Sequence, residues 1–242
     1  MIIYPAIDIK DGECVRLYQG VMKTAEKVAS DALETALSFK AAGAKWLHMV
    51  DLNGAISGKR VNSDIFLEIA KKSGLKVQLG GGIRTIEDIE FYLEKGISRL
   101  ILGSAAIVNP ALVEEALKLF GDKIAVGIDA KGGKAASDGW VKDSGLDYIE
   151  LAKKMEGLGV ACIIYTDIGC DGMLKGPNLE QLDKINNSVS CDIIASGGVT
   201  DLNDIKELKK LQLYGAICGR SIYSGSLDLK EAVAYAQGPQ EV

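Results

Sequence analysis

The chain has 242 residues, of which 48% are hydrophobic, so it can bury the core of one large α/β barrel or of two small domains. No apolar run approaches the roughly 18 residues of a membrane span, and the N-terminus lacks the basic start and cleavage site of a secretory signal. The net charge of −5, without clusters of basic and aromatic residues, argues against nucleic acid as a partner. We therefore expect a cytoplasmic protein that binds neither membrane nor nucleic acid.

Metal and cofactor motifs are missing from the sequence. No two cysteines form a Cys-x-x-Cys pair, and a single histidine, His48, is available as a further ligand. Structural zinc sites need several cysteine or histidine ligands at short spacings. We therefore expect free thiols, no metal and no organic cofactor. The scattered cysteines are Cys14, Cys162, Cys170, Cys191 and Cys218.

Apolar runs typical of strands alternate with amphipathic stretches typical of helices along the whole chain. The strand-like runs lie at 2–7, 45–50, 76–79, 99–102, 123–128, 160–165, 191–195 and 214–218. Helical patterns fall between them, for example at 85–95 and 203–211. Eight strand–helix units in this length predict an α/β fold, a single (β/α)8 TIM barrel over residues 1–242. Residues 237–242 are expected to form a frayed tail.

The sequence repeats itself at a displacement of 116 residues, the difference between positions 197 and 81. Gly81-Gly82-Ile83 recurs as Gly197-Gly198-Val199, and Gly103-Ser104 recurs as Gly219-Arg220. The same displacement relates Gly43 to Gly159, Asp51 to Asp167 and Asp88 to Asp204. One ungapped offset across strands two to four and six to eight indicates two fused half-barrels, at about 1–120 and 121–236.

An aspartate ends the first predicted strand of each half. Asp8 precedes Gly43 by 35 residues and Asp129 precedes Gly159 by 30, so the two aspartates occupy equivalent places. Such a residue often only caps the next helix. Two of them facing each other across a barrel mouth can instead act as proton acceptor and proton donor. Asp171, in the loop after the sixth strand, is a third candidate for the proton chemistry.

The repeated glycines predict two phosphate-binding cradles half a barrel apart. Glycine lets the backbone approach a phosphate closely, and the helix that follows supplies amide donors. A single glycine pair is weak evidence because tight strand-to-helix turns need glycine anyway. Pairs at symmetric positions indicate a long ligand with a phosphate at both ends. The predicted phosphate-binding residues are Gly81, Gly82, Gly103, Ser104, Gly197, Gly198, Gly219 and Arg220.

Two further residues have alternative interpretations. Trp140 ends the long polar loop that follows Asp129, where it can stack on a planar ring of the ligand or pack against the barrel rim. His48 sits inside an apolar strand run, where it can be part of the core or lie beneath the site.

Short motifs mark the strand ends along the chain. They are Pro5-Ala6-Ile7-Asp8-Ile9-Lys10-Asp11-Gly12, Val15-Arg16-Leu17, Val50-Asp51-Leu52, Gly80-Gly81-Gly82-Ile83-Arg84, Gly127-Ile128-Asp129, Asp138-Gly139-Trp140 and Ser196-Gly197-Gly198-Val199. As a set, and nearly from end to end, they closely resemble the phosphoribosylformimino-5-aminoimidazole carboxamide ribotide isomerases of histidine biosynthesis. No single motif would be specific.

This resemblance implies an Amadori rearrangement of an aminoaldose to an aminoketose, on a substrate with a phosphoribosyl group at each end. Asp8 would take the proton from C2 of the sugar, and Asp129 would protonate the ring oxygen and open the ring. The resemblance also implies supporting roles near these two groups. Thr166 and Asp171 would assist the acid or share its role, and Trp140 would cover the aminoimidazole. Arg16, His48 and Asp51 would contact the substrate. A monomer without metal or cofactor is expected.

The chain departs from the family pattern at two positions beside the expected site. Asn53 stands where many relatives carry aspartate, and Gly132 replaces the usual acidic residue in the loop after Asp129. Both changes can alter the fit of the substrate. Neither removes a proposed catalytic group.

Other functions stay open from the sequence. The cyclase of the following step is also a twofold barrel, but its family begins Pro-Cys-Leu-Asp-Val where this chain has Pro5-Ala6-Ile7-Asp8-Ile9. Trp140 and Arg16 are compatible with a dual-substrate isomerase that also acts on phosphoribosylanthranilate. A catalytically silent phosphosugar-binding barrel would be expected to lose both aspartates. An aldolase would need a Schiff-base lysine at a strand end, and Lys10 and Lys131 lie past those ends.

Overall fold

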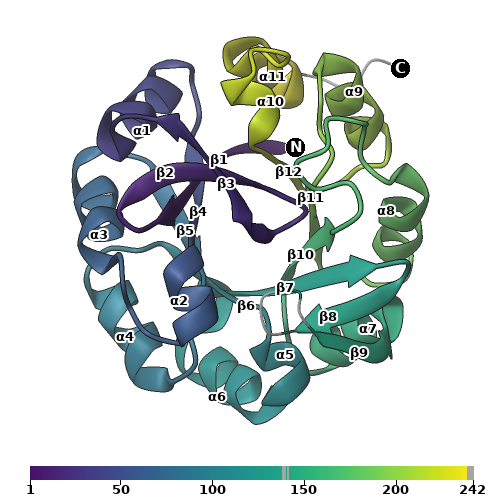
Figure 1. The fold of residues 1–242 in the computed structure, drawn as a ribbon. Coiled ribbons are helices and arrows are strands. Elements are labelled where there is room, and N and C mark those ends of the chain that lie inside the picture. The colour runs from purple at the N-terminus through teal and green to yellow at the C-terminus, as the bar shows by residue number, and fades with distance from the viewer. Residues whose placement is uncertain (138–139, 141, 239–242) are drawn as a thin grey trace.

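A computed structural model describes residues 1–137, 140 and 142–238. Figure 1 shows strands in the middle of the molecule and a ring of helices around them. Each of eight strands pairs in parallel with the next, and the last pairs with the first, so the barrel closes. The barrel strands are β1 (Ile2–Lys10), β4 (Trp46–Asp51), β5 (Lys76–Gly80), β6 (Arg99–Leu102), β7 (Ile124–Lys131), β10 (Cys162–Asp167), β11 (Asp192–Ser196) and β12 (Gly215–Cys218).

These strands confirm the predicted (β/α)8 barrel, and each begins within two residues of its predicted start. The two helices singled out from the sequence are α4 (Ile86–Glu94) and α9 (Leu202–Lys210). Their N-terminal ends are fixed by side chains that accept hydrogen bonds from free backbone amides. Thr85 caps α4 through the amide of Asp88, and Asp201 caps α9 in the same way.

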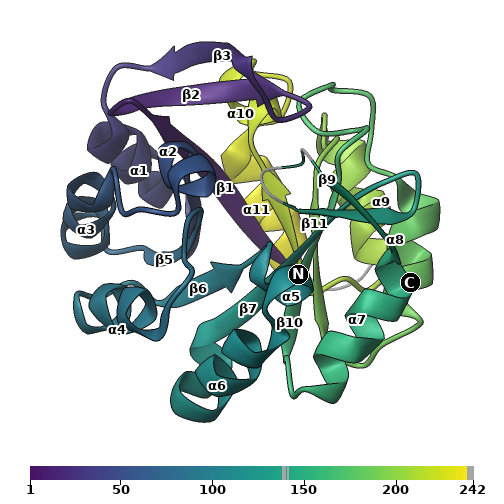
Figure 2. The same cartoon turned by 60° about the horizontal axis from the view of Figure 1, so that its bottom comes forward.

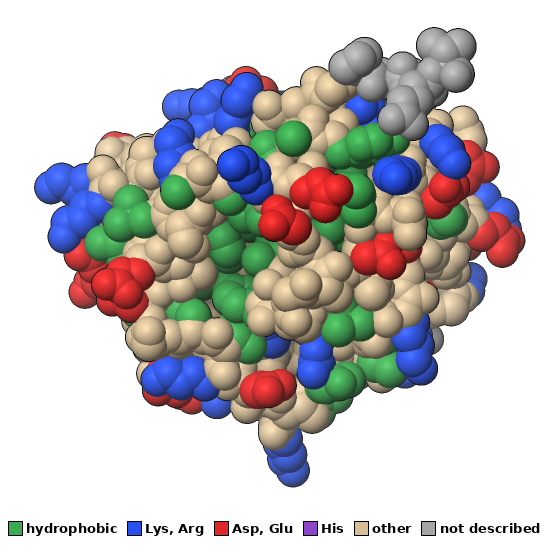
Figure 3. All heavy atoms as spheres, turned by 90° about the horizontal axis from the view of Figure 1, so that it is seen from above, with side chains coloured by type: hydrophobic (Ala, Val, Ile, Leu, Met, Phe, Trp, Pro, Cys, Tyr) green, Lys and Arg blue, Asp and Glu red, His purple; other side chains and the backbone are tan. Residues whose placement is uncertain are grey.

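The remaining helices cover the outside of the barrel or close its strand ends. They are α1 (Ala32–Ala41), α2 (Leu52–Ser57), α3 (Ser63–Lys72), α5 (Ala105–Val108), α6 (Pro110–Phe120), α7 (Tyr148–Gly157), α8 (Leu179–Asn186), α10 (Arg220–Tyr223) and α11 (Leu229–Gln237), with a 3-10 turn η1 (Gly121–Lys123). No helix within the described ranges is long and apolar enough to cross a bilayer. On the face shown in Figure 3, acidic and basic side chains are interspersed.

Two β-hairpins lie where the sequence predicted only loops. β2 (Glu13–Tyr18) and β3 (Val21–Ala29) follow β1, and β8 (Lys134–Ser137) and β9 (Lys142–Asp147) follow β7. Each hairpin adds antiparallel to the end of the first strand of its half. Figure 2 shows β2 and β3 lying across one end of the barrel. The two halves therefore also match in structure in the segments after their first strands, where the difference in loop length interrupts the sequence repeat.

Parts of two predictions lie outside the described residues. Asp138 and Gly139 of the motif that ends in Trp140 are among them, as are positions 239–242 of the expected tail. Gln237 and Gly238, the first residues of that tail, belong to the end of α11, where the Gly238 amide bonds back to Ala234 and Tyr235. The helix therefore extends to the start of the predicted tail.

The barrel is packed on both faces of its strands, as parallel sheets require. One large apolar cluster fills the space between strands and helices, and Ile7, Leu47 and Ile163 are fully buried in it. A second, smaller cluster fills the inside of the barrel. Its buried members are Tyr4, Ala6, Ile101, Ala125, Cys162, Ile164, Ile194 and Ile217. This inner cluster closes the barrel at the end where the strands begin.

The predicted glycine pairs are required by packing as well as by any ligand. Gly81 and Gly82 have φ of +100° and +80°, and Gly197 and Gly198 have +90° and +89°, a region that other residues rarely adopt. A Cβ on Gly82 would lie 2.4 Å from the carbonyl oxygen of Gly54. On Gly198 it would meet the Gly176 carbonyl oxygen at 2.3 Å. In both halves the preceding loop therefore packs directly on the glycine backbone.

Gly82→Ala should lower the free energy of unfolding by about 2–4 kcal/mol, because it combines a strained φ with a backbone clash. Gly103→Ala is the matched control, since its Cβ would have no atom within 4 Å and its φ is not positive. We expect the control to cost less than about 1 kcal/mol. Urea denaturation of both variants measures the difference, and equal stabilities would contradict the packing role of Gly82.

Candidate active site

A cavity of about 480 Å³ opens at the carboxyl ends of the barrel strands. This is the end at which barrels of this kind carry their active sites. All of the predicted site residues except Asp51 line it. The predicted residues that line the cavity come from both halves and are Asp8, Arg16, His48, Gly81, Gly82, Gly103, Ser104, Asp129, Trp140, Thr166, Asp171, Gly197, Gly198, Gly219 and Arg220.

Asp8 is held by a buried cation. It lies near the end of β1, opposite Val15 of the hairpin, and Arg16 Nη1 donates to its Oδ2 at 2.5 Å. A second guanidinium nitrogen of Arg16 donates to the Ala6 carbonyl oxygen, and Tyr223 donates to the same oxygen at 3.0 Å. Burial raises the pKa of Asp8, and the charge and hydrogen bond of Arg16 oppose that rise.

Asp129 occupies the equivalent place in the second half, and its hydrogen-bond partners among the described residues are neutral. Trp140 Nε1 donates to its Oδ2 at 2.7 Å, and Thr166, its register partner on β10, hydrogen-bonds to it as well. Burial raises the pKa of Asp129, and the two hydrogen bonds oppose the rise. The two carboxyl groups therefore differ in one respect that matters for proton transfer, the presence of a cation beside Asp8.

Asp171 brings a third carboxyl group to the cavity, from the loop after β10. The pKa of Asp171 is raised to about 7, mainly by burial. The negative charges of Asp8 and Asp129 also raise this pKa, whereas the positive charge of Arg16 lowers it. The loop is held by the tip of the β2–β3 hairpin. The Gln19 amide donates to the Asp171 carbonyl oxygen at 3.2 Å, and Gln19 Nε2 donates to Gly169 at 3.1 Å.

The two hairpins meet at the cavity through Gly20 and Trp140. A Cβ on Gly20 would lie 2.2 Å from Cε3 of the indole, so only glycine allows this approach. Trp140 has a φ of +73° and turns inward to reach Asp129. Of its two interpretations, the structure places the indole in the lining of the cavity. Gly20 is a site residue that sequence reasoning missed, because its role depends on the opposite half.

Each end of the cavity has a glycine followed by a short helix. Gly103 precedes α5 and has open space around its Cα, whereas a Cβ on Gly219, before α10, would lie 2.7 Å from the Arg16 guanidinium. Arg220 stacks on Tyr18 at 3.9 Å and donates to the Gly172 carbonyl oxygen at 3.1 Å. The cradle of the second half therefore lies beside two arginines.

Arg84 lines the cavity, although the sequence indicated it only as the last residue of a strand-end motif and not as a site residue. It follows the Gly81-Gly82 pair and donates to the Ala55 carbonyl oxygen at 3.3 Å. The 116-residue displacement places Thr200 at the equivalent position of the second half. A cation two residues after a predicted phosphate-binding glycine pair was the signal that could have identified it.

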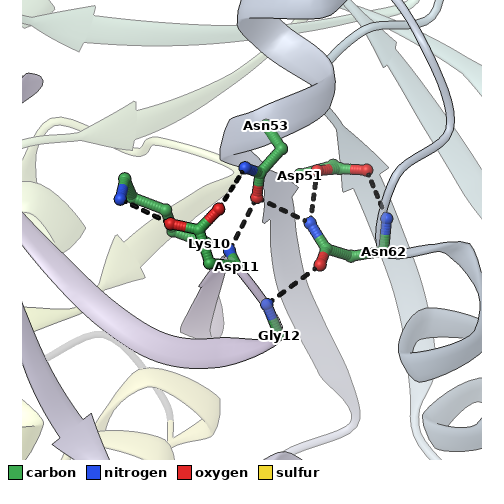
Figure 4. A network of polar contacts seen from close by, with 6 residues as sticks. All are labelled: Lys10, Asp11, Gly12, Asp51, Asn53 and Asn62. Atoms are coloured by element: carbon green, nitrogen blue, oxygen red, sulfur yellow. Dashed lines mark hydrogen bonds and ion pairs between the residues drawn. The ribbon is translucent and has the colours of Figure 1, made fainter.

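Asp51 does not line the cavity, although the sequence predicted it as a substrate-binding residue. It is buried, caps α2, and accepts hydrogen bonds from the amides of Gly54 (2.9 Å) and Val61 (3.1 Å). It also accepts from the amide of Asn62 (3.1 Å) and from Asn62 Nδ2 (2.7 Å) (Figure 4). All of its hydrogen-bonding capacity is used within the loop between β4 and α3. Asp167 in the second half does the same for Gly169 and Asn178. Asp51 was expected to contact substrate, and the structure instead places it in the loop scaffold.

The two departures from the family pattern have local explanations. Asn53 accepts from the Asp11 amide at 2.7 Å and donates to Asp11 Oδ1 at 2.8 Å (Figure 4). An aspartate at position 53 could make the first of these bonds but not the second, because a carboxylate has no proton to donate. Gly132 has a φ of +58° and Gly133 of +79°, the conformation of a two-residue hairpin turn between β7 and β8. Neither residue lines the cavity.

Metal-binding chemistry has no support in the part of the chain that the structure describes. Those residues contain no group of three or more histidine, cysteine or acidic side chains that could hold an ion. The five cysteines are free thiols.

Fold and cavity together define a (β/α)8-barrel protein with buried carboxyl groups at the carboxyl ends of its strands, the end at which barrel enzymes carry their active sites. Residues 2–228 match the family described as "Histidine biosynthesis protein", and the chain belongs to this family.

Curated relatives agree with this membership over nearly the whole chain. One from Clostridium novyi (strain NT) is 52% identical over 237 residues, which are 98% of this chain and 100% of the relative. One from Clostridium kluyveri (strain NBRC 12016) is 54% identical over 233 residues, 96% of this chain and 98% of the relative. Both are named 1-(5-phosphoribosyl)-5-((5-phosphoribosylamino)methylideneamino) imidazole-4-carboxamide isomerase.

Asp171→Asn should flatten the dependence of stability on pH. The folded-state pKa of about 7 lies above the ordinary 3.8, so the folded state binds this proton more tightly than the unfolded state does. The bound proton of Asp171 therefore adds at most about 4 kcal/mol to the free energy of unfolding. This contribution is complete below about pH 4 and is lost as the pH rises to about 7.

Urea denaturation at about pH 5 and about pH 8 measures this effect. We expect the wild type to lose more stability between the two pH values than the variant does. Asp122→Asn, at an exposed position in η1, is the control and should behave like the wild type. Equal losses in wild type and Asp171→Asn would contradict the elevated pKa.

Proposed function

We propose that the chain is an isomerase of 1-(5-phosphoribosyl)-5-((5-phosphoribosylamino)methylideneamino) imidazole-4-carboxamide, converting its aminoaldose to the aminoketose. The observation that carries the proposal is the pair of strand-end carboxyl groups in one cavity, one beside a cation and one beside neutral donors. The names of relatives that match nearly the full chain support the choice of substrate.

Their environments suggest how the two carboxyl groups divide the work. Arg16 stabilises the charged form of Asp8, so Asp8 is the base that removes the proton from C2 of the sugar. Asp129 is buried, and no cation among the described residues contacts it, which favours its protonated form. It is therefore the acid that donates a proton to the ring oxygen as the C1–O bond breaks.

The rearrangement then needs no group from outside the chain. Ring opening leaves an iminium at C1, removal of the C2 proton by Asp8 gives an enolamine, and its tautomerisation gives the ketone. Asp171, with its pKa near 7, can give or take a proton at neutral pH and assists, together with Thr166. Trp140 covers the aminoimidazole while its Nε1 holds Asp129.

Both phosphates of the substrate have matching places at the ends of the cavity. The backbone of Gly81, Gly82 and Gly103 would bind one, with Arg84 as its counter-ion, and Ser104 beside it. The equivalent Gly197, Gly198 and Gly219 would bind the other, with Arg220 nearby. Arg16, which lines the cavity beside Gly219, adds a second positive charge near this site. We further infer that the chain acts as a cytoplasmic monomer.

The first test follows absorbance when the purified chain meets the bisphosphorylated aminoaldose without ammonia or a glutaminase. We expect conversion to the aminoketose, because the proposed acid and base belong to one chain. Phosphoribosylanthranilate is run as a second substrate, and its turnover would extend the activity. Tight binding without conversion would contradict the proposal in favour of a silent phosphosugar binder, and conversion only with ammonia would favour a cyclase.

Asp8→Asn and Asp129→Asn should each lower kcat by about 10²–10⁴-fold, the contribution of a general acid or base. The KM should change much less, since neither carboxyl group contacts the proposed phosphate positions. Steady-state kinetics measures both constants, with Asp122→Asn as a control far from the cavity. Normal turnover in either variant would remove that residue from the mechanism.

A further inference from the structure

Beneath the cavity, a chain of polar side chains runs across three neighbouring strands. Register pairs His48 of β4 with Gln78 of β5, and Gln78 with Arg99 of β6. Gln78 Nε2 lies 3.0 Å from His48 Nδ1, and Arg99 Nε lies 3.2 Å from Gln78 Oε1. Gln78 and Arg99 are buried, next to the apolar cluster that fills the inside of the barrel.

The second half of the barrel builds the same layer without polar groups. The displacement of 116 residues relates His48, Gln78 and Arg99 to Ile164, Ile194 and Gly215. Register pairs Ile164 with Ile194 and Ile194 with Gly215, so the correspondence holds in three dimensions. The fold can therefore close this layer with apolar residues. Burying an arginine and two polar side chains costs free energy, which indicates a role beyond packing.

The order of donors and acceptors along the chain is fixed by Arg99. A guanidinium only donates, so the Gln78 side chain must turn its oxygen toward Arg99 and its NH2 group toward His48. His48 Nδ1 must then accept, which leaves the imidazole proton on Nε2. Arg99 is itself held in place, since it donates to the Tyr4 hydroxyl at 3.0 Å and stacks on Trp46 at 4.7 Å.

The imidazole is neutral as well as fixed. Burial lowers the pKa of His48 to about 3, and the charges of Arg16 and Arg99 lower it further in the same direction. A neutral imidazole with its proton on Nε2 has a single donor on the side away from Gln78. No described residue accepts from Nε2, and that nitrogen is not among the fully buried atoms without a partner. Because His48 lines the cavity, Nε2 opens into it.

The donor lies under the proposed base. Ala6 pairs with His48 and Asp8 pairs with Val50, so His48 is one inward-facing layer, roughly 6.6 Å, below Asp8. We propose that Gln78 and Arg99 are positioning residues that hold His48 as an Nε2–H donor to an oxygen of the reacting sugar. The identity of that ligand rests on the proposed function, whereas the tautomer does not.

Nitrogen-15 NMR of the labelled full chain tests the tautomer directly, because His48 is the only histidine. Long-range correlations from the ring protons distinguish a protonated from an unprotonated Nδ1. We expect Nδ1 to be unprotonated in the wild type. The carboxylate introduced by Gln78→Glu can accept from Arg99 but cannot donate to His48, so Nδ1 should become protonated in that variant.

Kinetics then tests the consequence. Gln78→Glu should lower kcat/KM about five- to tenfold, the value of one lost neutral hydrogen bond. Ile194→Leu, at the matching position of the apolar half, should keep both the Nδ1 signal and kcat/KM within about twofold of wild type. If the glutamate substitution prevents folding, Gln78→Leu replaces it, with a mixture of both tautomers as the expected result.

A wild-type Nδ1 that carries a proton, or an Nδ1 that stays unprotonated in Gln78→Glu, would overturn the inference. An unchanged kcat/KM in a variant whose tautomer has switched would contradict the proposed hydrogen bond from His48 Nε2 to the sugar. An inactive wild type whose Nδ1 is unprotonated would instead contradict the proposed isomerase while supporting the assigned tautomer, so the two failures are distinguishable.

Discussion

Closure of eight parallel strands is the constraint on which the rest of the structure depends. Each barrel strand pairs in parallel with two neighbours, and β12 pairs with β1, so all the barrel strands point the same way. All the loops that follow the strands therefore meet at one rim, although the residues they carry are separated by up to two hundred positions in sequence. Asp8 and Asp129 lie at one cavity for this reason, and no local property of either segment requires it.

The halves of the barrel share a scaffold and differ in their electrostatics. Asp51 and Asp167 brace equivalent loops, and the glycine pairs have almost the same backbone conformation in both halves. The strand-end aspartates nevertheless have different partners, a guanidinium for Asp8 and an indole for Asp129. Because a cation favours an ionised carboxyl and burial without one disfavours it, a duplicated frame can hold an acid and a base at once.

The same asymmetry extends to the layer beneath the site. One half has an apolar floor, while the other has a line of polar side chains that ends at His48. Where a repeated fold tolerates both solutions, the burial of polar groups in one half indicates a role beyond packing for that half. Comparison of the two halves therefore serves as an internal control on which buried groups the fold itself requires.

The sequence by itself determined the barrel and its repeat, and nearly all the site residues it predicted line the cavity, because strand periodicity and strand-end motifs are local. It could not decide what each residue touches. Asp51 has the same strand-end position as a ligand-binding group, and only the folded loop shows its carboxylate fully occupied by Gly54, Val61 and Asn62. The approach of Gly20 to Trp140 and the chain from Arg99 to His48 join distant strands or opposite halves. Contacts of that kind are set by barrel closure and burial, which only the tertiary structure decided.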